Sequence, residues 1–380
     1  MERPFYLKQI QTVYTVNPAC ALLGPRQCGK TTLAHQYARL LKDQRVHFFD
    51  LEDPTDLAKL VNSKLALESL EGLIVIDEIQ RKPDLFPMLR VLIDTYKKHF
   101  LILGSASQEL IRQTSETLAG RITYLDLNPF SLFEVEDISK LWVRGGFPLS
   151  YLANTQNQSL AWRKDYVRTY LEKDIKDFGF AIAPQALRRF WMMLSHYHGQ
   201  IFNASEIGRS MNVSHKTISH YLDILTGTFM VRRLSPWFEN LHKRQIKSPK
   251  IFVRDSGILH TLLGIEDELQ LLNHPKLGAS WEGFALEEVI RVLKADSEDC
   301  YFWATQSGAE LDLLIVQYGK KMGFEFKYTD SPKITKSMHI ALEDLKLDQI
   351  TLIIPGNHHF RLSEKVEVWG LEVFVRDQFH

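Results

Sequence analysis

The sequence has few cysteines and no long apolar run. Its 380 residues contain only three cysteines, Cys20, Cys28 and Cys300, whose spacing suits neither a pair nor a metal site. A disulfide-stapled scaffold is therefore excluded, and we expect a cytoplasmic protein from a reducing compartment. No segment approaches the ~18 apolar residues that cross a bilayer, and no signal-peptide pattern opens the chain. We expect neither export nor a membrane partner.

A net charge of one sign is also missing. Lysine and arginine number 46, and aspartate and glutamate also number 46. Because no whole-protein field draws such a chain to nucleic acid, that partner would have to bind a local patch. No internal repeat is visible, and 45% of the residues are hydrophobic, which indicates a globular chain. At ~100 to 200 residues per domain, the length predicts two or three domains.

Changes of pattern divide this α/β chain into four parts. In residues 1–128, short apolar runs alternate with helix-like stretches, as in a parallel sheet with crossover helices. Residues 129–183 turn helical and predict a lid, and residues 184–250 are helical and basic. Residues 251–380 open with helices and continue with strand-like runs, which predicts a second α/β domain.

A complete phosphate-loop motif follows the apolar run 19–23. It matches G-x-x-x-x-G-K-[ST], and a helical pattern starts at Thr32. Its glycines let backbone N–H groups wrap a polyphosphate, while Lys30 can reach the β and γ oxygens and Thr31 can ligate Mg²⁺. The motif predicts ATP and Mg²⁺ as cofactors and ADP as product. The candidate nucleotide-binding residues are Gly24, Pro25, Arg26, Gln27, Cys28, Gly29, Lys30 and Thr31 of the motif, with Thr32 directly after it.

An acidic pair supplies the second half of such a site. Asp77 and Glu78 directly follow the apolar run 73–76. Asp77 can hold the magnesium shell, and Glu78 can polarise the attacking water. The next apolar run, 100–103, leads into Ser105, a candidate for the polar residue between Glu78 and the γ-phosphate. A simple turn is the alternative for Ser105.

Together these motifs resemble those of prokaryotic AAA+ ATPases that carry a C-terminal domain of unknown function. The resemblance covers nearly the whole chain. Its marks are the segments Leu22-Leu23-Gly24-Pro25-Arg26-Gln27, Ile76-Asp77-Glu78-Ile79-Gln80, Leu118-Ala119-Gly120-Arg121, Asn128-Pro129-Phe130-Ser131 and Gly145-Gly146-Phe147-Pro148.

This resemblance implies a sheet of strand order 5-1-4-3-2. It also implies that Glu78 polarises water and that Ser105 is the first sensor of the γ-phosphate. Arg121 falls at the usual arginine-finger position, where it would reach a neighbouring subunit's nucleotide in a homo-oligomer. Arg112, one helix earlier, is the alternative finger. For a sensor from the lid the candidates are Arg144, Arg163 and Arg168.

The third part has the pattern of a winged helix-turn-helix. Asn203 reads as a helix cap, with Glu206 three residues later, and two short helical patterns meet at residues 212–214. Residues 229–234 and 251–254 are the expected wing strands. If the second helix enters a groove of nucleic acid, its exposed side chains are His215, Lys216, Ser219 and His220.

This region is also basic. Residues 185–250 hold a surplus of seven positive charges, which predicts contact with a phosphate backbone, and we expect DNA as the partner. The alternative is a module used only for packing or protein contact. The ten cations are Arg188, Arg189, Arg209, Lys216, Arg232, Arg233, Lys243, Arg244, Lys247 and Lys250.

A set of carboxylates marks the C-terminal part. Asp312 lies in one strand-like run, and Glu325 follows thirteen positions later in the next, with Lys327 on the same side at period two. This spacing resembles the core of the PD-(D/E)xK nucleases. The resemblance implies that the acids hold Mg²⁺ while the lysine positions or activates water. Glu282 is the expected helix-borne acid, and Glu287 is its alternate.

The sequence therefore predicts a Mg²⁺-dependent ATPase of the AAA+ type that acts on nucleic acid as a homo-oligomer. A metal-dependent nuclease site at its C-terminal end is a further expectation. The rival interpretation is a nucleotide-gated regulatory or interaction protein whose C-terminal domain is catalytically inactive.

Overall fold

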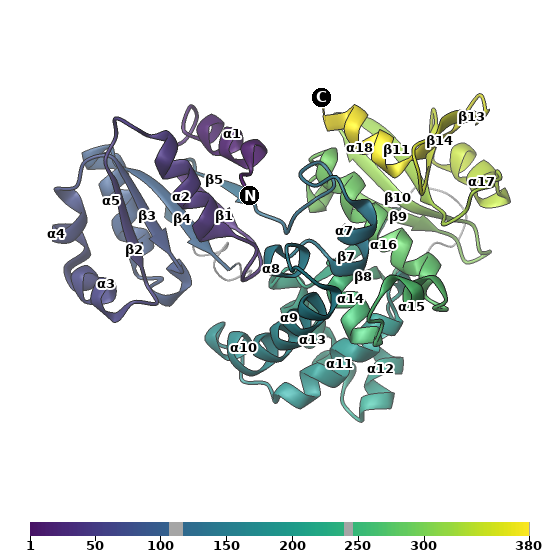
Figure 1. The fold of residues 1–380 in the computed structure, drawn as a ribbon, viewed down its shortest axis with the longest axis horizontal. Helices are drawn as coiled ribbons and strands as arrows, with labels where there is room; N and C mark the ends of the chain where they lie inside the picture. The colour runs from purple at the N-terminus through teal and green to yellow at the C-terminus, as the bar shows by residue number, and fades with distance from the viewer. Residues whose placement is uncertain (106–116, 239–245, 380) are drawn as a thin grey trace. The chain divides into compact units, whose positions relative to one another are not determined.

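The chain folds into two compact units. The structure is a computed structural model, and it describes residues 1–105, 117–238 and 246–379. The first unit comprises Met1–Pro129 with Gly227–Phe229, and the second comprises Phe130–Thr226 and Met230–His380 (Figure 1). Within the described ranges, no helix has the length and apolar character that crossing a bilayer requires.

The first unit is built on a five-stranded parallel sheet. Its order, β2-β3-β4-β1-β5, is the predicted order 5-1-4-3-2 seen from the other edge, so that prediction is confirmed. Strands β1, β3 and β4 are buried on both faces, which explains why they read as continuous apolar runs. The strands are β1 (Ala19–Leu23), β2 (Val46–Asp50), β3 (Leu73–Asp77), β4 (His99–Gly104) and β5 (Ile122–Asp126).

Helices connect these strands and begin at local signals. Pro4 opens the first helix, and Asp53 caps another by accepting a hydrogen bond from the Thr55 backbone N–H. The helices of this unit are α1 (Pro4–Val13), α2 (Lys30–Leu40), α3 (Pro54–Lys59), α4 (Ser63–Glu68) and α5 (Leu85–Tyr96).

The second unit opens with helices. The predicted lid region contributes Phe130, Leu141 and Tyr166 to hydrophobic cores that also contain later residues of this unit. A lid role for these helices stays a prediction. The helices are α7 (Ile138–Arg144), α8 (Pro148–Tyr151), α9 (Gln156–Thr169), α10 (Ile175–Asp177), α11 (Pro184–His196), α12 (Ala204–Met211) and α13 (His215–Gly227).

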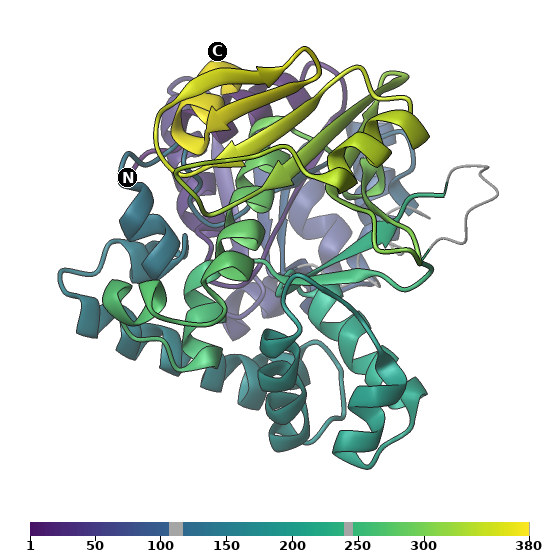
Figure 2. The same cartoon turned by 90° about the vertical axis from the view of Figure 1, so that its right-hand side faces the viewer.

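A nine-stranded sheet of order β13-β14-β12-β11-β10-β9-β7-β8-β6 runs through this unit. In Figure 2 its yellow and green strands lie at the top and the teal helices of residues 184–227 at the bottom. The strands are β6 (Gln200–Ile201), β7 (Val231–Pro236), β8 (Lys250–Val253), β9 (Cys300–Ala304), β10 (Glu310–Gln317), β11 (Lys320–Phe326), β12 (Ile350–Ile354), β13 (His359–Ser363) and β14 (Val366–Gly370).

One junction makes this sheet continuous. Strand β7 pairs with β8 in antiparallel fashion and with β9 in parallel, through Ser235 opposite Tyr301 and Pro236 opposite Phe302. The helix-turn-helix region and the C-terminal strands therefore share one hydrogen-bonded sheet. The remaining helices are α14 (Ser256–Leu263), α15 (Glu268–Leu272), α16 (Leu277–Val292), α17 (Lys336–Asp344) and α18 (Leu371–Phe379).

A buried ion network joins β7 to α16. The Arg232 guanidinium donates to Glu287 with an Nη2 to Oε2 distance of 3.0 Å, and Arg254 Nε lies 3.4 Å from the same carboxylate oxygen. Burial alone would raise the pKa of Glu287, but the charges of Arg232 and Arg254 lower it well below the usual range. Arg232 and Glu287 are therefore structural residues of this unit.

We expect Arg232→Met to lower the unfolding free energy of the second unit by about 3–5 kcal/mol, because Glu287 would lose a principal partner inside the protein. The neighbouring Arg233→Met is the matched control. Arg233 is half exposed and pairs with half-exposed Asp223, so its loss should cost about 0–1 kcal/mol. All seven tryptophans lie in the second unit, so denaturant unfolding followed by tryptophan fluorescence isolates it. Equal costs for the two variants would contradict the assignment.

Candidate active site and associated charge clusters

The phosphate loop is shaped by two glycines of the motif. Gly29 has a φ of 101° at the start of α2, in the left-handed region that favours glycine. Gly24 lies so close to the end of β5 that an added Cβ would stand 2.2 Å from the Leu127 carbonyl oxygen. The loop is thus held between β1, α2 and the segment after β5, and it leads directly into the N-terminus of α2, where backbone N–H groups favour an anion.

Lys30 lies under this loop. Its Nζ donates to the carbonyls of Gly24 and Pro25 at 3.0 and 2.9 Å, and to Ser105 Oγ at 3.3 Å. Both Lys30 and Ser105 are buried. The structure thus brings Ser105, at the end of β4, to the phosphate-loop lysine, as a residue that senses the γ-phosphate requires.

Thr31 and Asp77 meet across the ends of α2 and β3. The Thr31 hydroxyl donates to Asp77 Oδ2 at 2.6 Å, and Asp77 Oδ1 accepts from the Glu78 backbone N–H at 2.9 Å. A hydroxyl and a carboxylate that converge in this way are oxygen ligands suited to Mg²⁺. The two residues therefore fit the predicted magnesium site, where the ion would neutralise charge on the phosphates.

Glu78 adopts a left-handed backbone conformation, with a φ of 53°. Gln80 donates a hydrogen bond from its side-chain amide to a Glu78 carboxylate oxygen. Burial raises the pKa of Glu78, and the Lys30 charge opposes that rise. A desolvated carboxylate held by Gln80 suits the role of accepting a proton from water.

The candidate finger Arg121 is engaged within its own chain. Its Nε and Nη2 donate to the two carboxylate oxygens of Asp94 at 2.6 and 2.9 Å. The alternative, Arg112, lies outside the described residues. Arg121 would have to leave Asp94 to reach a neighbour's nucleotide, and its role as a finger stays a prediction.

The three candidate lid arginines differ in their surroundings. Arg163 is fully buried, and its Nη1 donates to the Gly257 carbonyl at 2.8 Å. Arg144 donates to Gln156 Oε1 and to the Ala153 carbonyl. Arg168 is exposed and pairs with Glu172 one turn further along its helix. Arg163 and Arg144 thus hold backbone and side-chain groups of the second unit.

Sequence reasoning missed Arg3. Its guanidinium is buried and donates to the carbonyls of Cys28, inside the phosphate loop, and of Asn128, after β5. It therefore braces the loop against the segment that approaches Gly24. A single arginine before a helix carries no pattern that predicts this contact.

Two helices and paired strands lie where the sequence predicts a winged helix-turn-helix, whose identity as such a module stays a prediction. Asn203 caps α12 by accepting from the Glu206 N–H, and Asn212, with a φ of 56°, ends it before α13. Strand β8 pairs in antiparallel fashion with β6, which precedes α12, and with β7, which follows α13. On α13, Lys216 is exposed together with His215 and His220, whereas Ser219 is half buried.

The basic patch is smaller than the sequence count suggests. Arg232 and Lys250 are both buried, so neither is presented to a partner. Each is instead neutralised by carboxylates of the C-terminal part. These carboxylates lie beyond residue 250, so the charge count of residues 185–250 did not include them. Lys243 and Arg244 lie outside the described residues. The exposed members are Arg188, Arg189, Arg209, Lys216, Arg233 and Lys247.

The predicted C-terminal residues do converge. Lys327 Nζ lies 3.5 Å from Asp312 Oδ2 and 3.1 Å from Glu325 Oε2, across the hairpin of β10 and β11. Glu282, on α16, lies in the same cluster, whereas its alternate Glu287 lies in the Arg232 network. The structure thus favours Glu282 as the helix-borne acid.

Lys250 completes this cluster, a role that the sequence analysis did not predict. Its Nζ lies 3.3 Å from Glu282 Oε1 and 3.5 Å from Asp312 Oδ1, and it also pairs with Glu310. We call these six residues the carboxylate cluster: Lys250, Glu282, Glu310, Asp312, Glu325 and Lys327.

The acids of the carboxylate cluster differ in the direction of their pKa shifts. Burial raises the pKa of Glu282 to about 7, and burial with the Asp312 charge raises the pKa of Glu325. Burial would also raise the pKa of Asp312, but Lys250 and Lys327 lower it below its usual range. Asp312 therefore carries the negative charge between two ammonium groups.

This arrangement does not fit a divalent metal. Mg²⁺ needs oxygen ligands at about 2.0–2.1 Å and therefore an unoccupied space between them. The Lys250 ammonium already occupies the space between Glu282 and Asp312. Across the residues that the structure describes, no group of three or more His, Cys, Asp or Glu side chains is arranged to hold a metal ion. The predicted nuclease activity stays a prediction without support from this geometry.

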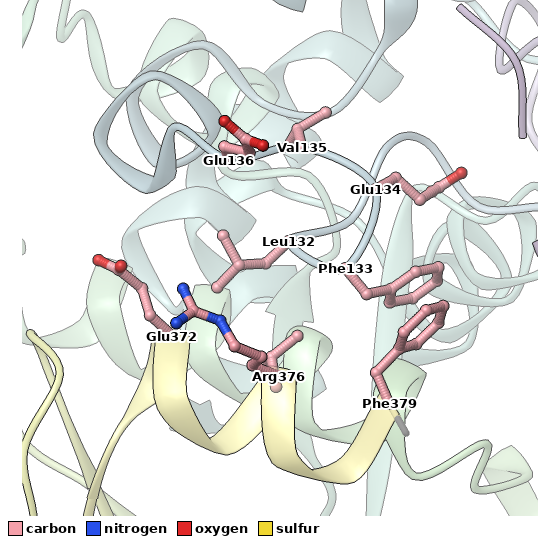
Figure 3. A pocket seen from close by; sticks show the side chains of 9 residues that line it. Leu132, Phe133, Glu134, Val135, Glu136, Glu372, Arg376 and Phe379 are labelled. Carbon is pink, nitrogen blue, oxygen red and sulfur yellow. The ribbon is translucent and has the colours of Figure 1, made fainter.

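A separate hollow of about 550 Å³ lies in the second unit beside α18 (Figure 3). Phe133 and Phe379 stack at one end, with ring centroids 4.9 Å apart, and Arg376 lies along α18 between Glu372 and Phe379. None of the site residues predicted from the sequence lines it. Its walls are Leu132, Phe133, Glu134, Val135, Glu136, Glu372, Val375, Arg376 and Phe379.

Comparison with known families divides the chain in three. Residues 16–136 match the model of an AAA domain, which agrees with the sheet order and the phosphate loop. Residues 135–269 and 277–374 match two domains of unknown function, DUF8612 and DUF4143. The first unit is therefore an ATPase domain of the AAA class.

The chain is similar over most of its length to two mycobacterial proteins, the uncharacterized proteins Rv2008c of Mycobacterium tuberculosis and Mb2031c of Mycobacterium bovis. Each is 47% identical over 353 residues, which cover 92% of this chain and 79% of the relative. The chain belongs to the family of these proteins.

Likeness to solved structures is weaker. The Walker-type ATPase PABY2304 of Pyrococcus abyssi gives a TM-score of 0.49 at 13% identity, covering 69% of this chain and 96% of that one. RuvB of Thermotoga maritima gives 0.28 at 21% identity, covering 60% and 85%. Scores this low carry no inference about function.

We expect Lys30→Ala to abolish tight ATP binding, because the ammonium contacts the phosphates in the ground state. Glu78→Gln should keep binding and lose hydrolysis, because the carboxylate acts only on water. Titration with a fluorescent ATP analogue and an assay of phosphate release separate the two effects. Lys42→Ala, an exposed lysine of the same unit, is the control and should change neither. Equal ATP affinity in wild type and Lys30→Ala would contradict the assignment.

Proposed function

We propose that the protein is a Mg²⁺-dependent ATP hydrolase of the AAA+ type that works as a homo-oligomer on nucleic acid. One observation carries the catalytic part of the proposal. The ends of α2, β3 and β4 bring an ammonium, a hydroxyl–carboxylate pair and a serine to one phosphate loop, through the contacts of Lys30, Thr31, Asp77 and Ser105.

In this proposal each side chain has one task. Lys30 binds the β and γ oxygens, and Ser105, hydrogen-bonded to Lys30, responds to the γ-phosphate. Thr31 and Asp77 hold Mg²⁺, which offsets phosphate charge. Glu78, oriented by Gln80, accepts the proton of the attacking water.

For assembly we propose that Arg121 acts on a neighbouring subunit. It is half exposed on the first unit, and Asp94 holds it by two hydrogen bonds within the same chain. Water screens an ion pair at the surface, so exchange of Asp94 for a neighbour's phosphate costs little.

The contact with nucleic acid is proposed for α12 and α13 as a winged helix-turn-helix. Three features support it: the capped two-helix arrangement, the antiparallel strands β6, β8 and β7, and exposed cations on both helices. Arg209 lies in the last turn of α12 and Lys216 in the first turn of α13, so both can reach phosphates at the groove edge.

For the C-terminal domain we propose a nuclease-like fold that does not cleave in the arrangement described. The hairpin of Asp312 and Glu325 supports the likeness, and the Lys250 ammonium between Glu282 and Asp312 supports the absence of cleavage. This part coincides with the rival interpretation, in which the domain serves regulation or interaction.

We expect the double variant Arg209→Ala with Lys216→Ala to weaken binding to duplex DNA and to reduce the salt slope of log K by about 2, because two phosphate contacts are lost. Fluorescence anisotropy with a labelled duplex at several salt concentrations measures both. Lys42→Ala is again the control and should leave the slope unchanged.

The same duplex should raise ATP turnover of the wild type and not of the double variant. A nucleotide-gated regulatory protein without a nucleic-acid partner gives no such stimulation. Unchanged turnover with single- and double-stranded DNA and RNA would therefore remove the nucleic-acid part of the proposal and leave the ATPase part standing.

A further inference from the structure

The side chain of Lys250 crosses from one family region to another. Lys250 is the first residue of β8, opposite Ile201 of β6 and Leu234 of β7, within the region of residues 135–269. Its acidic partners Glu282, on α16, and Asp312, on β10, belong to the region of residues 277–374. The continuous sheet through β7 and β9 fixes this approach.

The ammonium is almost fully buried, at 2% exposure of the residue. A buried cation is stable only when acids and hydrogen bonds compensate for its lost hydration. Here three carboxylates do so, from Glu282, Glu310 and Asp312. Lys250 and the acids therefore depend on each other.

Both carboxylate oxygens of Asp312 have partners. Its Oδ2 accepts from the Phe326 backbone N–H at 3.0 Å and lies 3.5 Å from Lys327 Nζ. Its Oδ1 faces Lys250. A divalent ion that used Asp312 would have to approach two ammonium groups at short range, and like charges in a site of low dielectric repel strongly.

We propose that Lys250 is the resident cation of the carboxylate cluster, that it excludes divalent metal ions, and that loss of its charge converts the cluster into a metal site. Glu282, Glu310, Asp312 and Glu325 are not arranged around a metal while Lys250 is present. Without its charge they would be able to turn their oxygens toward Mg²⁺ or Mn²⁺, which prefer such ligands. The inference goes beyond the proposed ATPase function and rests on the geometry of the second unit alone.

The test is the number of Mn²⁺ ions that each full-length variant binds, measured by electron paramagnetic resonance of free Mn²⁺. All variants carry Asp77→Asn, so that the phosphate-loop site contributes equally little. The first comparison sets the chain with an intact cluster against the same chain with Asp312→Asn. We expect equal Mn²⁺ binding, and loss of a bound ion on Asp312→Asn would overturn the proposal.

The second comparison adds Lys250→Met, which keeps much of the side-chain volume and removes the charge. We expect one additional Mn²⁺ per chain, at least tenfold tighter than any binding to the Lys250 protein, and its loss when Asp312→Asn is combined with Lys250→Met. Lys250→Arg keeps the charge and should gain no ion. A folded Lys250→Met chain, checked by tryptophan fluorescence, that gains no Mn²⁺ would overturn the proposal.

Should Lys250→Met fail to fold, the first comparison still decides, because it uses only chains with Lys250. Failure of the ATPase proposal has a separate signature, since it concerns turnover at the phosphate loop and every chain in this test carries Asp77→Asn.

Discussion

Compensation of buried cations governs both units of this protein. A charge removed from water is stable only beside groups that replace its hydration, and the identity of those groups decides what the cation can still do. Lys30 donates to two carbonyls and a hydroxyl, which are neutral groups, so its charge remains suited to a polyphosphate. Lys250 lies among carboxylates, so its charge is neutralised within the protein and is not available to a ligand. A buried lysine is thus suited to binding phosphate in the first unit, whereas a buried lysine in the second unit is proposed to exclude divalent metal ions.

The elements near in sequence were predictable. The phosphate loop and the Asn203 cap rest on motifs of a few residues, whereas the sheet order was implied by the family resemblance, and each appears in the structure. The convergence of Asp312 with Glu325 followed from two strands joined by a short turn, because period two fixes which side chains share a face.

Partners distant in sequence were not predictable in this way. Arg232 and Lys250 read as members of a basic surface, because the acids that bury them lie 55 and 32 positions further on, on α16. Arg3 meets Asn128 across 125 positions, with no motif at either end. The choice between Glu282 and Glu287 also needed the fold, since both lie on α16 and face different cations.

The central claim is that the phosphate loop of the first unit hydrolyses ATP. It is tested most directly by phosphate release from the purified wild-type chain, measured against ATP concentration with Mg²⁺ and again after chelation of Mg²⁺. The account predicts continuous release that saturates with ATP and stops on chelation. Release no greater than that of Glu78→Gln at any ATP or Mg²⁺ concentration, alone or with nucleic acid, would contradict it.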